Sequence, residues 1–158
     1  GLSVYLLISN LHKIDPKKSA KISANTFKSL AVVVLLFLTI INLSVSLSMS
    51  NQSLGIGLER VVLPAVGLLI AVMGYFMRDI KPNYFIGLRL PWTLEDEENL
   101  AATHQLVSKL WMPAGIVMVA ASIIFPFMTA FIITIATTLI IVIIPAVFSF
   151  RYYRKKQV

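Results

Sequence analysis

The amino-acid sequence predicts an all-α integral membrane protein with about four full transmembrane helices. Hydrophobic residues make up 58% of the 158 residues, against roughly 45–50% in an ordinary soluble domain. Charged residues make up 13%, about half of the usual roughly 25%. The apolar residues also collect into blocks that are long enough to cross a bilayer, which takes about 20 residues as a helix.

Four apolar blocks are the predicted spans of a single helical membrane domain that covers residues 1–158. They run from about residue 27 to 49, 58 to 77, 110 to 127, and 130 to 150. Residues 110–150 carry no charge, and as one helix they would be about twice as long as a hydrocarbon core of ~30 Å is thick. We therefore expect the chain to fold back near residues 127–130, beside Pro126.

The first residues are expected to be the tail of a further transmembrane helix whose beginning is missing. Residues 2–8 are apolar and charge begins at Lys13, so the segment is too short to span a bilayer. No basic region precedes it, which is unlike a signal peptide. A short segment lying at the membrane interface is the alternative.

The basic residues gather at the ends of the apolar blocks, and this pattern predicts the orientation of the chain. The segment before the first span, the 78–109 loop and the C-terminal tail are rich in Lys and Arg, whereas Arg60 lies beside the short 51–57 loop. Because cytoplasmic loops carry the excess of Lys and Arg, we expect the 78–109 loop and the C-terminus to be cytoplasmic. The same placement accounts for the net charge of +7 without direct binding of nucleic acid.

The sequence offers no set of catalytic or metal-binding residues, so we expect neither an enzyme nor a cofactor. There is no cysteine, and His12 and His104 are the only histidines. A zinc site needs several such ligands in a fixed geometry. No Asp, Glu, Lys or Arg lies within the predicted spans away from their ends, which counts against a proton- or ion-coupled transporter.

The informative segment is the polar insert between the second and third predicted spans. Pro91 biases the residue before it away from helix, and Thr93 is a good N-cap. The acids at 95–98 suit the positive end of a helix dipole. We therefore expect a helix that starts at Thr93 and continues toward the third span. The i, i+4 and i+7 spacing places these residues on one face: Leu100, His104 and Val107.

Arg89 and the aromatic residues around it allow two interpretations. An Arg among apolar neighbours needs carboxylate or carbonyl partners, and the acids at 95–98 are available. Alternatively, Arg89 extends to lipid head-group phosphates. Tyr84, Phe85 and Trp92 would then anchor an elbow of the chain at the membrane surface, where such rings are enriched.

Residues 83–94 spell NYFIGLRLPWTL, and they are followed by acids, Asn99 and the pair Thr103-His104. This segment resembles the signature of the SdpI family of bacterial membrane proteins. The matching positions are Asn83, Gly87, Arg89, Pro91, Trp92, Thr93, Glu98, Thr103 and His104. Leu100 and Gln105 depart from the pattern, which usually has Trp and a basic residue at these positions.

The resemblance implies a multi-pass protein of the bacterial plasma membrane that protects its producer from a secreted antimicrobial peptide. It also implies toxin sensing, with recruitment of a cytoplasmic transcriptional repressor to the membrane. The partner-binding or signalling loop is then expected to comprise Asn83, Gly87, Arg89, Pro91, Trp92, Thr93, Glu95, Glu98, Thr103 and His104.

Two other classes of function remain open from the residues alone: a transporter or channel component, and a structural membrane subunit. A stripe of small residues in the second span, Gly67, Ala71 and Gly74, suits close helix packing in each class.

Overall fold

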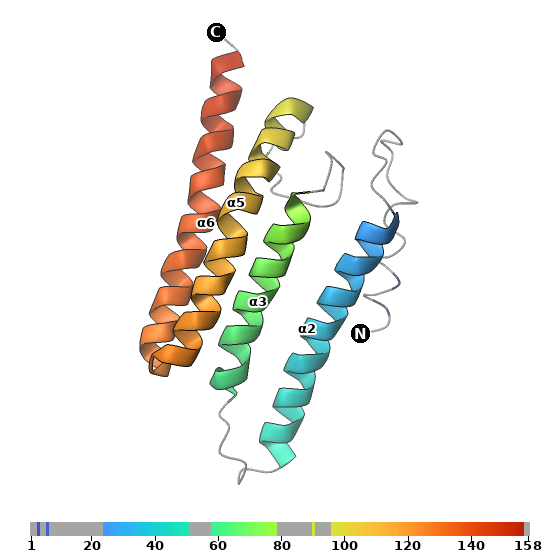
Figure 1. Cartoon of the computed structure of the whole chain (residues 1–158), viewed down its shortest axis with the longest axis vertical. Coiled ribbons are helices and arrows are strands. Elements are labelled where there is room, and N and C mark those ends of the chain that lie inside the picture. Colours follow the sequence, from blue (N-terminus) through green and yellow to red (C-terminus); the bar gives the residue numbers. More distant parts are fainter. Residues whose placement is uncertain are drawn as a thin grey trace.

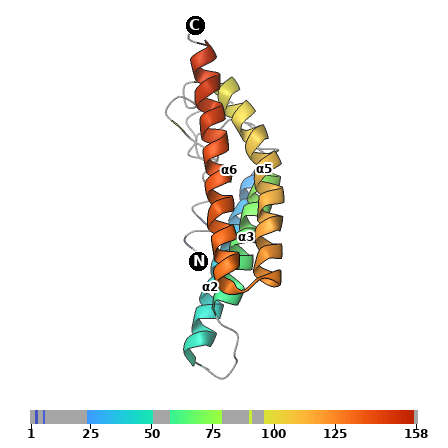
Figure 2. The ribbon, with the colours of Figure 1, turned by 90° about the vertical axis from the view of Figure 1, so that its left-hand side faces the viewer.

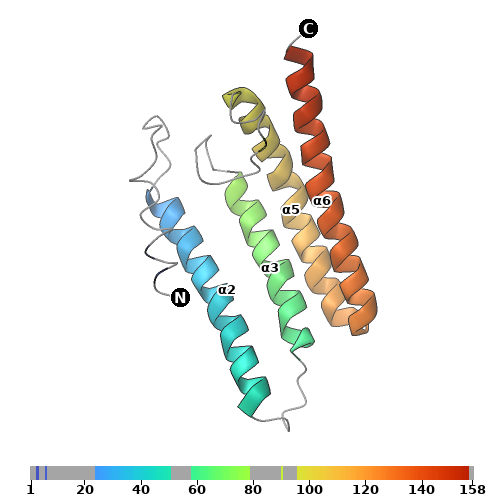
Figure 3. The ribbon, with the colours of Figure 1, turned by 180° about the vertical axis from the view of Figure 1, so that it is seen from behind.

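The computed structural model describes residues 24–50, 58–78, 90 and 96–156, together with Ser3 and Leu6. Within these residues all regular structure is helical. The helices with described bounds are α2 (Ala24–Ser50), α3 (Glu59–Met77), α5 (Glu97–Ile124) and α6 (Phe127–Lys156). They lie side by side in the order of the chain and alternate in direction (Figures 1 and 3).

All four described helices are long and apolar enough to cross a membrane, in agreement with the predicted fold class. Seen edge-on they form a thin layer (Figure 2), so both faces of the layer present apolar side chains. Ile123, Met128 and Ile132 are 75%, 68% and 65% exposed. Such exposure of large apolar residues suits a surface that faces lipid.

The two C-terminal helices are longer than the spans predicted at 110–127 and 130–150. α5 has 28 residues and α6 has 30, which correspond to about 42 and 45 Å at about 1.5 Å per residue. A hydrocarbon core is about 30 Å thick. Both helices are therefore longer than a hydrocarbon core is thick. The excess length is at their shared polar end, which holds the charged N-terminal turns of α5 and C-terminal turns of α6.

The start of α5 corrects the expected cap at Thr93, which itself lies outside the described residues. Asp96 is the N-cap, in an extended conformation, and its side chain accepts hydrogen bonds from the backbone N–H groups of Glu98 and Asn99. Asp is at least as good a cap as Thr, and the later start lets its carboxylate also meet α6. The predicted face of this helix is confirmed, because Leu100, His104 and Val107 are all buried.

The reversal between α5 and α6 comes earlier than the expected 127–130. Phe125 is extended, with φ −105° and ψ 158°, as is usual for a residue before proline. Pro126 provides the carbonyl that accepts the first hydrogen bond of α6, from Ala130 N–H at 3.0 Å. Proline has no N–H to continue α5, yet its φ suits the start of a helix, so α6 begins directly after it.

The predicted stripe of small residues packs closely against α5. A Cβ on Gly115 of α5 would lie 2.4 Å from both the Ala71 backbone nitrogen and the Gly67 carbonyl oxygen. A Cβ on Gly74 would lie 2.5 Å from the backbone nitrogen of Met112. The absence of side chains at these positions lets the α3 and α5 backbones touch, the usual device for joining helices within a membrane.

The predictions for residues 2–8 lie outside the described residues, apart from Ser3 and Leu6, both of which are helical. Those for residues 79–95 also lie outside, apart from Leu90. The predicted contacts of Arg89 and the aromatic anchor therefore remain predictions.

Candidate functional site at the polar ends of α5 and α6

The candidate site lies where the first turns of α5 meet the last turns of α6. The alternating direction of the helices brings these segments side by side, about fifty residues apart in the chain (Figure 1). The described part of this region begins at Asp96, directly after residues 79–95, which carry most of the sequence motif and are called the motif loop below. The site therefore anchors one end of that loop to the C-terminal helix.

A buried polar cluster joins the two helices. The Asn99 amide nitrogen donates to the Ser149 carbonyl oxygen at 3.0 Å. The Asn99 amide oxygen accepts from the Thr103 and Ser149 hydroxyls, each at 3.2 Å. All three residues are completely buried. Because a buried polar group without a partner is costly, this mutual satisfaction fixes one register of α5 against α6.

A cluster of charges covers the same end of the helix pair. The Lys156 ammonium lies 2.9 Å from an Asp96 carboxylate oxygen and 2.7 Å from one of Glu98. Lys156 also lies 5.5 Å from the centroid of the Tyr152 ring. One lysine thus links the cap of α5, its first turn and the last turn of α6.

The surroundings of Asp96 favour its charged form. Burial by itself would raise the pKa of the Asp96 carboxyl, but the hydrogen bond from Lys156 and those from the Asn99 and Glu98 backbone outweigh it. The pKa of Asp96 therefore lies below its ordinary value of 3.8. An ionised carboxylate at this position is also favoured by the positive end of the α5 dipole.

A further contact between α5 and α6 lies farther from their polar ends. The Trp111 indole nitrogen donates to the Ile141 carbonyl oxygen at 3.1 Å. Pro145, buried within α6, has no N–H to offer the carbonyl four residues earlier, which is that of Ile141. Trp111 supplies the missing donor, and this compensation makes a proline inside a membrane helix tolerable.

The structure describes three of the predicted site residues. The Glu98 side chain is 70% exposed and ion-paired, so it belongs to the surface of the site. Thr103 and His104 are buried, which places them inside the helix pair and suits a role in positioning rather than direct contact with a partner. The other predicted residues lie outside the described residues: Asn83, Gly87, Arg89, Pro91, Trp92, Thr93 and Glu95.

Sequence reasoning counted Asp96 only among the acids at 95–98, and it did not include Asn99, Ser149 and Lys156 among the site residues. The spacing of Asn99 and Thr103 was a usable signal, because residues four apart share a helix face. Nothing in the sequence assigned Ser149 or Lys156 to the same site, since that depends on the register between α5 and α6. No group of three or more potential metal ligands occurs among the described residues.

The helices and their polar end define a multi-pass helical membrane protein. Residues 79–149 match the model of the SdpI/YfhL protein family, a segment that runs from the motif loop to the Ser149 contact. Over this segment the chain is therefore similar to this family.

Over 100 residues the chain is 30% identical to the immunity protein SdpI of Bacillus subtilis (strain 168). The match covers 63% of this chain and 48% of that protein, so the chain corresponds to about half the length of the relative. No solved structure matches the chain.

Proposed function

We propose that the chain acts as a membrane immunity protein that protects a bacterial cell from a secreted peptide toxin, by binding and not by catalysis. The observation that carries the proposal is the family match over residues 79–149, together with a 30% identical relative that is named an immunity protein. This segment coincides with the motif loop and the joined pair α5–α6. The proposal therefore assigns the function to a part of the molecule with its own interhelical contacts.

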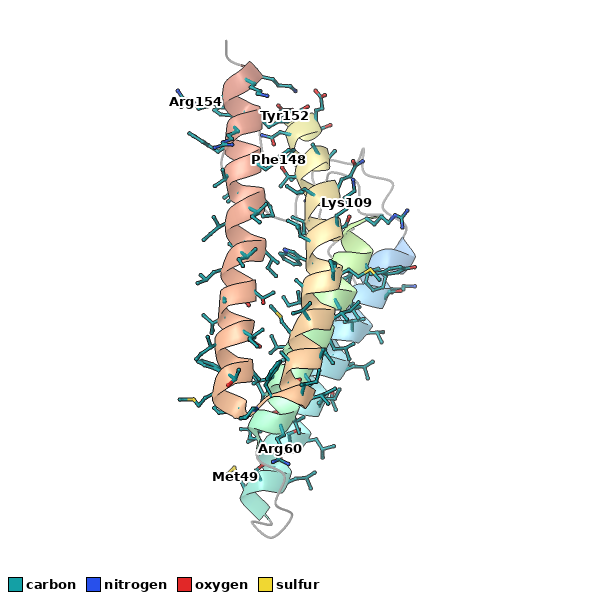
Figure 4. All side chains as sticks on the ribbon, turned by 60° about the vertical axis from the view of Figure 1, so that its left-hand side comes forward. Met49, Arg60, Lys109, Phe148, Tyr152 and Arg154 are labelled. Atoms are coloured by element: carbon teal, nitrogen blue, oxygen red, sulfur yellow. The ribbon has the colours of Figure 1, made fainter. Side chains whose placement is uncertain are left out.

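The charge pattern supports a cytoplasmic location of the polar end in this proposal. Lys109, Tyr152 and Arg154 lie toward one end of the helices, whereas Met49 and Arg60 lie toward the other (Figure 4). Because the alternating helices bring the basic segments to the same end, the excess of Lys and Arg indicates which side is cytoplasmic. The motif loop would then face the cytoplasm.

In the proposed mechanism the helices bind the toxin within the bilayer, and the loop reports its presence to a cytoplasmic repressor. Arg89, Trp92 and the acids at 95–98 form the docking surface for that partner. The cap at Asp96 holds the C-terminal end of the loop, through Lys156, against α6. Asp96 and Glu98, at the end of the loop, are both ion-paired with Lys156 of α6. A toxin that shifts α6 relative to α5 would consequently move the loop.

A survival assay tests the proposal. The complete gene is expressed in toxin-sensitive bacteria as wild type, Arg89→Ala or Arg60→Ala, at equal membrane abundance, and the cells are challenged with the secreted peptide. We expect survival with wild type and Arg60→Ala, and loss of protection with Arg89→Ala. Arg60 is a matched control, since it is an exposed arginine at the opposite end of the helices.

Each result bears on a different part of the proposal. Survival with all three versions would keep immunity and move the site from the loop into the helices. Death of cells that express the wild type would refute the proposal that the protein protects against this toxin. Recruitment of a fluorescent repressor to the membrane, measured in the same strains, separates signalling from protection.

A further inference from the structure

A groove runs along an exposed face of α6, and it points to a binding site for a membrane lipid. All of its lining residues come from this one helix, and its volume is about 550 Å³. Ile143, Ile144, Val147 and Phe148 line one part of it. These side chains belong to two neighbouring rows of residues spaced four apart, and such rows leave a groove between them on a helix surface.

The groove changes character along its length. The rows that begin at Ile143 and Ile144 continue, one and two turns later, into Arg151, Tyr152 and Lys155, which line the other end. The distance along the axis from Ile143 to Lys155 is about 18 Å at ~1.5 Å per residue. Half of a hydrocarbon core is about 15 Å. The groove therefore has the length of one leaflet, with its cationic end at the level of the head groups.

The two cations at this end have no carboxylate partner within residues 96–156. The ion pairs described there join Lys156 to Asp96 and Glu98, and they leave out Arg151 and Lys155. Both side chains are exposed and lie one turn apart on the same row. An anionic group placed between them would neutralise two positive charges that no described acidic residue meets.

One wall of the groove is held in place by the candidate site. The Tyr152 ring packs near Phe148, with ring centroids 6.1 Å apart. The Tyr152 ring also lies 5.5 Å from the Lys156 ammonium, which is ion-paired with Glu98 of α5. The aromatic wall is thus ordered by contacts made on its other side, which reduces the entropy lost when a flexible chain settles against it.

We propose that this groove binds an anionic glycerophospholipid. The phosphate lies between Arg151 and Lys155, and an acyl chain lies along Ile143, Val147 and Phe148 toward the middle of the bilayer. Charge complementarity favours an anionic head group. The apolar length of the groove favours a phospholipid, which has an acyl chain, over a free phosphate ion. The proposal requires that the chain spans the membrane, and it does not depend on protection against a toxin.

Native mass spectrometry of the full-length protein tests this assignment by titration with phosphatidylglycerol and, separately, with phosphatidylcholine. Arg151→Gln and Lys155→Gln remove the proposed phosphate ligands. Arg154→Gln is the charge-matched control, because Arg154 does not line the groove and lies over the Phe150 ring at 5.9 Å. Val147→Trp fills the apolar part. Val142→Trp is its control, since Val142 is equally exposed, at 43% against 45%, and lies outside the groove.

We expect phosphatidylglycerol to bind in preference to phosphatidylcholine. Arg151→Gln or Lys155→Gln should each weaken its binding about fivefold, and the double variant about 25-fold, since each basic residue near an anionic lipid contributes on the order of 1 kcal/mol. Val147→Trp should weaken binding with the charges intact. Both controls should change binding less than about twofold, well below the effect of one such residue.

Three outcomes would overturn the assignment. Equal losses with Arg151→Gln and Arg154→Gln would indicate a general attraction to a basic surface. Equal binding of the two lipids would remove the role of the phosphate. Unchanged binding in Val147→Trp would show that the acyl chain does not occupy the groove.

Discussion

Replacing Asn99 by Ala should separate the polar ends of α5 and α6, and the structure sets the size of the effect. The Asn99 side chain makes three hydrogen bonds, all buried. Each is worth on the order of 0.5–1.5 kcal/mol, with an average of about 0.6 for polar contacts measured between membrane helices. Their loss therefore costs about 2–4 kcal/mol.

Two effects reduce this cost. The hydroxyls of Thr103 and Ser149 can turn toward carbonyls of their own helices, and Ala is the better helix former by up to about 0.7 kcal/mol. We expect a net loss of about 2 kcal/mol in the free energy of unfolding. SDS titration in mixed micelles, followed by tryptophan fluorescence, measures this quantity.

A double-mutant cycle with Ser149→Ala isolates the contact between the helices. Because the two side chains bond each other directly, the losses should fail to add, with a coupling energy of about 1–2 kcal/mol. Ser108→Ala is the control, since the Ser108 hydroxyl donates within α5, to the Gln105 carbonyl. Additive losses of unfolding free energy would refute the conclusion that this cluster links α5 to α6. A loss from Asn99→Ala no larger than that from Ser108→Ala would refute it as well.

Three further predictions follow from the same helix pair. Trp111→Phe should cost about 1–2 kcal/mol of unfolding free energy in the native sequence but much less in a Pro145→Ala background, where a backbone N–H replaces the indole donor; equal costs in both backgrounds would contradict this. The stability contributed by Asp96 should be present at neutral pH and lost as pH falls through its lowered pKa, below the ordinary 3.8. Amide exchange in the first turn of α5 should show this transition, at higher pH when Lys156 is replaced by Met. Gly115→Ala should destabilise the protein by about 1–3 kcal/mol despite its better helix propensity, because the new Cβ meets backbone atoms that cannot turn away; thermal melting that stays unchanged would contradict it.

The amino-acid sequence predicted the four long apolar helices that the described residues form. Hydropathy and charge act residue by residue, so a run such as 110–150 indicates membrane crossing without reference to any neighbour. The face of α5 that carries Leu100, His104 and Val107 was also predictable, because helical periodicity is local. The cap and the reversal were misplaced by a few residues, since several polar residues and two turn positions compete for each role.

Only the tertiary structure decided which side chains meet across the helices. Asn99 was visible as a polar residue on a buried face, but its partner Ser149 lies fifty positions away. The same holds for Trp111 and the Ile141 carbonyl, which Pro145 exposes within α6. The axial register between two helices depends on side-chain packing and on the position of the reversal at Pro126. A shift of one residue would move every such pair by about 1.5 Å along the axis and 100° around it.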